Sequence, residues 1–282
     1  MSESAAQYLK RCHVLTYLQD AIAQLLEHRE HNSKVNPMRF LADYFVGVQH
    51  GTQSLFREFS FVKATPQNRL SLVKLFYRCF KSIGHRGDLL NIREYHSLVT
   101  LICPDFPLET IQKTARIILT DDVMDCLVAF RDFIYAFQVQ FVYEEFLKLC
   151  LEVYSSVLAA AIRANSESTA SRVVVVPTST ILPTKPKDSK DTITTTVPEN
   201  VDSLVFIGLL EEQLESRKLS CYPPMDVLRH ILKYKQRVSY YEFVSLVVKS
   251  EEVNEHLGAL PSSEKLFACS LSPSTFRKQS HT

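Results

Sequence analysis

Glycine is scarce in this chain. Its 282 residues contain six glycines, at positions 47, 51, 84, 87, 208 and 258. The sequence accordingly has no GxGxxG or GxxxxGK[ST] phosphate loop and no GxSxG nucleophile elbow. These sites depend on glycine because the backbone must approach a phosphate closely or turn in a left-handed conformation. The common glycine-dependent active sites are therefore absent. This absence does not by itself forbid an enzyme, but it agrees with our expectation of a protein that is not an enzyme and needs no cofactor.

The sequence also lacks a membrane segment, a signal peptide and paired cysteines. No run approaches the ~18 apolar residues of a membrane span, and no basic region followed by an apolar core opens the chain. The seven cysteines include no CxxC pair, which favours reduced thiols in the cytosol. A net charge of +1 gives no general attraction to nucleic acid or anionic membrane. We expect a cytoplasmic protein that binds neither.

Residues 65–146 form the stretch around which the chain is organised. Their apolar periodicity predicts two helix–loop–helix units back to back, as in a pair of EF-hands. Thr65 and Pro66 have the residue types of an N-cap and a first helical position, and Asn91 with Glu94 matches a capping box. The pattern predicts an all-α, EF-hand-like core.

The residues that would hold calcium are missing from this core. Calcium needs six to eight oxygens, usually from loop positions 1, 3, 5, 7, 9 and a Glu at 12, with glycine at 6. With Glu94 at position 12 of the first loop, Ile83 occupies position 1. In the second loop Asp121, Asp125 and Asp132 fall at 1, 5 and 12, but a cysteine replaces the glycine. We expect no bound metal, and a weakly calcium-responsive regulator remains the alternative.

The N-terminal segment, residues 8–50, is predicted to be a helical hairpin whose second helix starts at Asn36-Pro37. Tyr8-Leu9, Ala23–Leu26 and Asn36–Phe45 resemble the dimerization-docking hairpin of protein kinase A regulatory subunits and DPY-30-like proteins. That resemblance implies a groove for an amphipathic partner helix, and a general docking adaptor is a second hypothesis. The alternative is a hairpin that only caps the core. The candidate partner-contacting residues are Leu15, Leu18, Ile22, Leu41 and Phe45.

A more specific resemblance covers nearly the whole chain. It is carried by residues 51–69, 87–90, 94–96, 103–109 (CPDFPLE), 121–127, 175–179 and 257–261. These segments are similar to the family of centriolar satellite-associated tubulin polyglutamylase complex regulators. The C-terminus departs from the family pattern, which has a longer acidic, Pro/Ser-rich tail, whereas this sequence stops at Thr282 with Lys and Arg nearby.

The resemblance implies a non-catalytic regulator or scaffold of the complex that adds glutamates to tubulin. The implied partners are subunits of that complex, including its ligase-like catalytic subunit, and possible contacts are microtubules or tubulin. The implied locations are the cytoskeleton, centrosome, centriolar satellites and the base of the cilium.

A basic strip suggests one mode of binding. Lys74, Arg78 and Lys81 follow i, i+4, i+7 spacing on one side of a predicted helix. Such a strip fits an acidic subunit or a glutamate-rich tubulin tail. The alternative is an ordinary solvated helix face.

The remaining chain is predicted to be helical on both sides of a linker. A bend is expected near Val142-Tyr143, because one helix through that region would be unusually long. The β-prone run Val173–Val176 lies in the linker. The predicted organisation is a hairpin (8–50), an EF-hand-like core (51–163), a Ser/Thr/Pro-rich linker (164–200), a second small helical unit (201–261) and a disordered tail (262–282).

Overall fold

The described part of the chain is mostly helical, as predicted, with only short strands. The computed structural model describes residues 4, 7–9, 12–119, 126–170, 200–219 and 221–262. The helices are α2 (Val14–His31), α3 (Pro37–His50), α4 (Phe59–Lys63), α5 (Pro66–Arg86), α6 (Ile92–Thr100), α7 (Leu108–Ile118), α8 (Phe130–Val142), α9 (Glu144–Ala170), α10 (Ser203–Arg217), α11 (Met225–Leu232), α12 (Tyr240–Lys249) and α13 (Glu251–Leu257). The strands have two residues each: β1 (Leu89–Leu90), β2 (Val128–Ala129), β3 (Val201–Asp202) and β4 (Arg237–Val238).

Two short antiparallel ladders join the helix–loop–helix units in pairs. In the first pair, α5–β1–α6 meets α7–β2–α8, with Leu89 opposite Ala129 and Leu90 opposite Val128. In the second, β3 leads into α10 and β4 lies between α11 and α12, with Val201 opposite Val238. The EF-hand-like pairing predicted for residues 65–146 is therefore present, and it is repeated in the second half.

Side-chain caps start the helices where the sequence indicates. The Thr65 hydroxyl accepts a hydrogen bond from the Asn68 backbone N–H at 3.0 Å, with Pro66 at the first helical position. Asn91 and Glu94 form the full capping box at the start of α6. Each cap pairs backbone N–H groups that have no partner inside the helix. The predicted helix starts are confirmed.

An aromatic core centred on α8 holds the first pair together. Phe133, Phe137 and Phe141 stack along one side of α8, and the ring of Tyr95 lies 3.8 Å from that of Phe133. Tyr95 also donates a hydrogen bond to the Val128 carbonyl at 2.8 Å, which satisfies its buried hydroxyl. This core fixes the position of α8 against the helices on either side.

The chain bends between α8 and α9, as predicted, because Val142 ends one helix and Glu144 begins the next. Arg69 of α5 lies beside the bend. Its Nη1 atom donates to Glu145 Oε2 at 2.7 Å and, more weakly, to the Val142 carbonyl at 3.4 Å. Burial alone would raise the pKa of Glu145, but the Arg69 guanidinium lowers it below the usual value.

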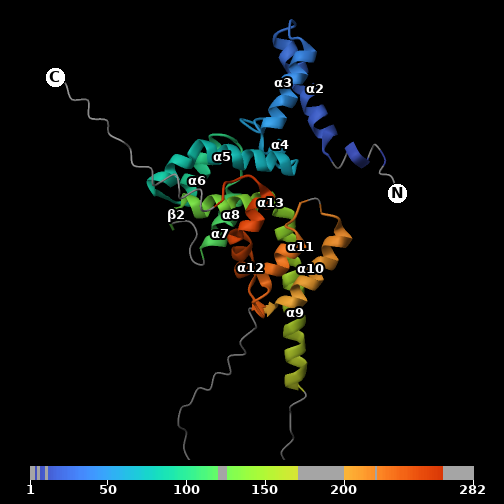
Figure 1. Cartoon of the computed structure of the whole chain (residues 1–282), viewed down its shortest axis with the longest axis vertical. Coiled ribbons are helices and arrows are strands. Elements are labelled where there is room, and N and C mark those ends of the chain that lie inside the picture. Colours follow the sequence, from blue (N-terminus) through green and yellow to red (C-terminus); the bar gives the residue numbers. More distant parts are fainter. Residues whose placement is uncertain are drawn as a thin grey trace, which may run out of the picture.

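Helix α9 continues to Ala170, so the first residues of the predicted linker are helical. It packs along α10 and thereby joins the two halves (Figure 1). The run Val173–Val176 and the rest of the predicted linker to residue 199 lie outside the described residues. Within the described ranges, no helix combines the length and apolar character needed to cross a membrane. The domain boundaries stay a prediction.

Candidate partner-binding surfaces

The N-terminal hairpin projects from the body (Figure 1). Asn36 accepts hydrogen bonds from the backbone N–H groups of Met38 (3.0 Å) and Arg39 (3.2 Å), which starts α3 after the turn. Gly51 ends α3 in the left-handed conformation, with φ of 71°, where a side chain would be strained. Local caps therefore define both ends of α3.

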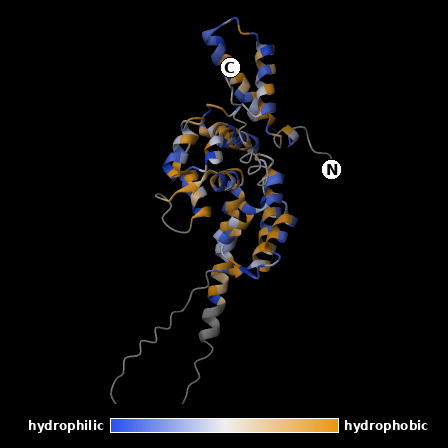
Figure 2. Cartoon of the chain, turned by 60° about the vertical axis from the view of Figure 1, so that its left-hand side comes forward, coloured by the Kyte–Doolittle hydropathy of each residue, from blue (hydrophilic) through white to orange (hydrophobic). Residues whose placement is uncertain are grey.

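Four of the five candidate docking residues are exposed on this hairpin. The exposed fractions are 49% for Leu15, 37% for Leu18, 50% for Ile22 and 37% for Phe45, while Leu41 is half-buried. Leu15, Leu18 and Ile22 share one face of α2 because they follow i, i+3, i+7 spacing. Figure 2 shows hydrophobic residues along the projecting hairpin.

Three further large apolar side chains enlarge the exposed surface: Leu26, Met38 and Val46. Leu26 continues the α2 stripe four residues beyond Ile22, so periodicity alone identifies it. Val46 does not follow the α3 stripe, and only the structure reveals its exposure. We call the set Leu15, Leu18, Ile22, Leu26, Met38, Phe45 and Val46 the hairpin surface.

Tyr17 attaches the hairpin to the core. It is buried on α2, and its hydroxyl lies 2.9 Å from Thr65 Oγ1 and 3.0 Å from Asn68 Oδ1 at the start of α5. Ala21 and Leu25 are buried on the same side of α2. The helix thus has one face against its neighbours and another face free to meet a partner.

Asp20 ties three segments together at the base of the hairpin. Its carboxylate accepts hydrogen bonds from Arg57 Nη1 at 2.9 Å, from Tyr44 Oη at 2.6 Å and from Gln24 Nε2 at 2.7 Å. Burial alone would raise the pKa of Asp20, but these donors, with Arg57 foremost, lower it below the usual value. The orientation of the hairpin is therefore fixed by a charged, hydrogen-bonded junction.

The predicted basic strip lies on α5. Arg78 and Lys81 are exposed and Lys74 is half-buried, while Leu72 and Phe76 on the other side are fully buried. Helix α5 contains no Asp or Glu. Within the described ranges, none of the three strip cations forms a salt bridge within 4.0 Å. The strip is a concentration of uncompensated positive charge.

Comparisons with known proteins identify the family. A family profile described as the CSTPP1 N-terminal domain matches residues 2–51. Over 255 residues the chain is 45% identical to centriolar satellite-associated tubulin polyglutamylase complex regulator 1 of Bos taurus, covering 90% of this chain and 75% of the relative. The chain belongs to this family. The Danio rerio relative is 44% identical over 263 residues, which cover 92% of this chain and 75% of the relative. The Homo sapiens relative is 44% identical over 255 residues, which cover 90% of this chain and 74% of the relative.

No solved structure matches the chain significantly. The matched profile of the regulator family spans the hairpin, including every residue of the hairpin surface. The family assignment predicted from sequence is confirmed.

The EF-hand-like loops of this family member do not assemble a metal site in the part that can be described. Glu94 accepts a hydrogen bond from the Asn91 backbone N–H at 2.8 Å, so its carboxylate serves the capping box. Asp132 is exposed in the first turn of α8, whereas Asp121 and Asp125 lie outside the described residues. Among the described residues, no group of three His, Cys, Asp or Glu side chains is placed to hold an ion.

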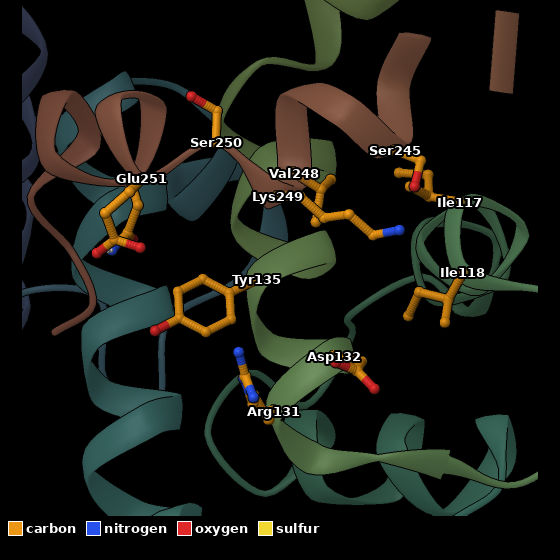
Figure 3. Close-up of a pocket in the computed structure, with 11 residues that line it drawn as sticks. Ile117, Ile118, Arg131, Asp132, Tyr135, Ser245, Val248, Lys249, Ser250 and Glu251 are labelled. Carbon is orange, nitrogen blue, oxygen red and sulfur yellow. Dashed lines mark hydrogen bonds between the residues drawn. The ribbon is translucent and has the colours of Figure 1, made fainter. Parts of the chain in front are cut away.

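A cavity of about 480 Å³ lies between the two helix–loop–helix pairs (Figure 3). Ile118, Tyr135 and Val248 form apolar walls, and Arg131 with Lys249 brings positive charge to it. Asp132 and Glu251 add two carboxylates. Neither His nor Cys is among the described residues that line it. The two positive and two negative side chains of the described lining balance in charge. This lining also holds no nucleophile that is hydrogen-bonded to a histidine base.

Proposed function

We propose that this protein is a non-catalytic subunit that binds the tubulin polyglutamylase complex and regulates it at centriolar satellites and cilia. The observation that carries the proposal is the hairpin surface, an exposed apolar face on the segment that the family profile matches. The relatives are named as regulators of that complex, which supports a regulatory role. The shortage of glycine-dependent active-site motifs supports leaving the chemistry to a ligase-like subunit.

The hairpin surface suits an amphipathic helix from a partner subunit. Leu15, Leu18 and Ile22 offer a stripe at helical spacing, and Phe45 adds an aromatic side chain from α3. Fully burying a large apolar side chain is worth roughly 1.5–3 kcal/mol, and these side chains, whose exposed fractions are 37–50%, contribute part of that gain against the cost of association. The junction at Asp20 holds the surface in one orientation before binding, which reduces that cost.

The basic strip supplies a second proposed contact, with an acidic partner. Arg78 and Lys81 are exposed, Lys74 is half-buried, and α5 carries no carboxylate, so an acidic subunit or a glutamate-rich tubulin tail meets no repulsion from this helix. Such a contact acts mainly on the rate of association and weakens as salt increases.

The experiment is purification of the tagged chain from ciliated cells, followed by mass spectrometry of stoichiometric partners. We expect the ligase-like subunit and its companions to be recovered with the unmodified chain and lost with Leu18→Asp. Leu204→Asp is the matched control, because Leu204 is 81% exposed on α10, outside the hairpin. Recovery of the complex with a folded Leu18→Asp variant would contradict docking at the hairpin.

The same surface favours one second candidate function, a general adaptor for amphipathic helices. That function predicts recovery of unrelated anchoring proteins and self-association of residues 1–50, without the ligase-like subunit. The purification therefore separates the two candidates directly.

A further inference from the structure

A separate groove lies where α7, α9 and α12 meet. Its volume is about 240 Å³, and it is distinct from the hairpin surface and from the basic strip on α5. The side chains that give it its character are Lys113, Arg116, Leu147, Lys148, Leu151 and Tyr241. Tyr240 fixes its geometry, because its hydroxyl donates to the Leu147 carbonyl at 3.2 Å and so joins α12 to α9.

The groove is positively charged because nearby acids are already paired elsewhere. Glu144 of α9 itself lines the groove, but its carboxylate pairs with Lys63 at 2.8 Å. Also on α9, Glu145 pairs with Arg69, and Glu152 pairs with Arg217 at 2.7 Å. Among the described residues, the salt-bridge partner of Lys113 is Glu109, one turn away on α7.

Arg116 and Lys148 are both exposed, and in the described part of the chain neither has an acidic partner within 4.0 Å. The two cations therefore sit at the groove with their charge uncompensated, which attracts a negatively charged ligand.

Apolar side chains accompany these cations. Leu151 is 47% exposed and Tyr241 51% exposed, although both are large, and Leu147 with Val244 forms a buried base beneath them. The groove therefore combines an exposed leucine and tyrosine with unpaired cations. A ligand complements this surface if it carries an apolar side chain for the first two residues and neighbouring carboxylates for the cations.

The size of the groove selects the kind of ligand. Small-molecule and cofactor sites usually occupy about 300–1,000 Å³, and this groove is smaller than that range. It has room for one large side chain. We propose that the groove binds an acidic peptide segment of a partner protein, with one large apolar side chain against Leu151 and Tyr241 and flanking carboxylates at Arg116 and Lys148.

Binding of a synthetic probe by the full chain tests this proposal. The probe is a fluorescent nonapeptide with a central Leu and four Glu on each side, and binding is measured by fluorescence anisotropy. We expect Arg116→Glu with Lys148→Glu to weaken binding by about tenfold or more, since like charges then face the peptide. Leu151→Ser, or a peptide with Gly in place of Leu, is expected to weaken it about tenfold through lost apolar contact.

A matched control separates this groove from general electrostatics. Arg29→Glu with Lys34→Glu reverses the same number of charges on exposed cations of the hairpin, which no proposed contact uses, and is expected to leave peptide binding within about twofold. Any of three outcomes would overturn the proposal: equal losses of binding in both double variants, no effect of replacing the central Leu, or tighter binding to DNA or anionic vesicles than to the peptide. Leu18→Asp is expected to leave peptide binding unchanged, so the hairpin proposal and this one fail independently.

Discussion

Arg57 donates hydrogen bonds from both terminal guanidinium nitrogens to the two carboxylate oxygens of Asp20. This two-point contact joins α2 to the segment before α4, and the Arg57 guanidinium also lies 4.0 Å from the centre of the Phe61 ring. Bidentate pairs of this kind fix direction as well as distance. The pair therefore determines how the hairpin surface is presented to a partner.

Replacing Asp20 with Asn is expected to lower stability by about 1.5–3 kcal/mol at pH 7, the usual range for hydrogen bonds to charged groups. Because the folded-state pKa of Asp20 lies below the unfolded value of about 3.9, its contribution is complete above that value and is lost as pH falls through the folded pKa. The difference between variant and parent should shrink at low pH.

Chemical denaturation at pH 7 and near pH 3 measures this difference. Asp43→Asn is the control, because Asp43 is exposed and its contact with Arg39 is 3.9 Å. A pH-independent effect of Asp20→Asn would contradict the assigned role of its charge.

Tyr17→Phe should destabilise the protein by about 1–3 kcal/mol, because the change leaves the buried polar groups of Thr65 and Asn68 short of a partner. The measurement is the denaturant midpoint. Tyr234→Phe provides the comparison, since Tyr234 is 83% exposed and its hydroxyl is solvated. Equal midpoints for the two variants would mean that Tyr17 does not anchor the hairpin.

Two helical glycines should respond oppositely to alanine. At Gly84 a Cβ atom would lie 3.0 Å from Cδ1 of Phe130, whose side chain is held in the aromatic core, whereas nothing lies within 4 Å of a Cβ at Gly208. Gly208→Ala is expected to stabilise α10 by about 0.5–1 kcal/mol through helix propensity. Gly84→Ala is expected to cost about 1–3 kcal/mol through overpacking.

Thermal melting of both glycine variants checks this contrast. A Gly84→Ala variant that melts as high as Gly208→Ala would show that α5 and α8 separate easily at Phe130.

Local features of the fold follow from the sequence because they depend on neighbouring residues. Thr65 with Pro66, and Asn91 with Glu94, specify helix starts within four positions, and apolar spacing specifies the faces of α2 and α5. The exposed hairpin residues, with the exception of Val46, follow from the same reasoning, since a two-helix hairpin cannot bury all its apolar side chains.

Contacts between distant residues could not be predicted in this way. Asp20 and Arg57 are 37 positions apart, and Arg69 and Glu145 are 76 apart, so no local spacing connects them. The groove beside Lys148 also escapes sequence reasoning, because its charge depends on which neighbouring acids are paired elsewhere. Sequence patterns identify charged residues but not the partners that neutralise them.

Reversing the charge of the basic strip should weaken capture of an acidic partner in a salt-dependent way. We expect the variant with Lys74→Glu, Arg78→Glu and Lys81→Glu to associate with microtubules about tenfold more slowly than the unmodified chain at low salt, because like charges then oppose the encounter. The difference should narrow at physiological ionic strength, where the screening length is about 8 Å.

Stopped-flow or surface-based association rates at two salt concentrations measure this effect. The control reverses a single charge elsewhere, at Lys34, an exposed cation in the turn of the hairpin, and should change the rate little. The strip lies on the solvent side of a helix whose other side is buried, so these substitutions leave the core intact. A triple variant with unchanged rates at low salt would assign the strip to ordinary solvation of α5 and leave the hairpin surface as the remaining proposed contact with the complex.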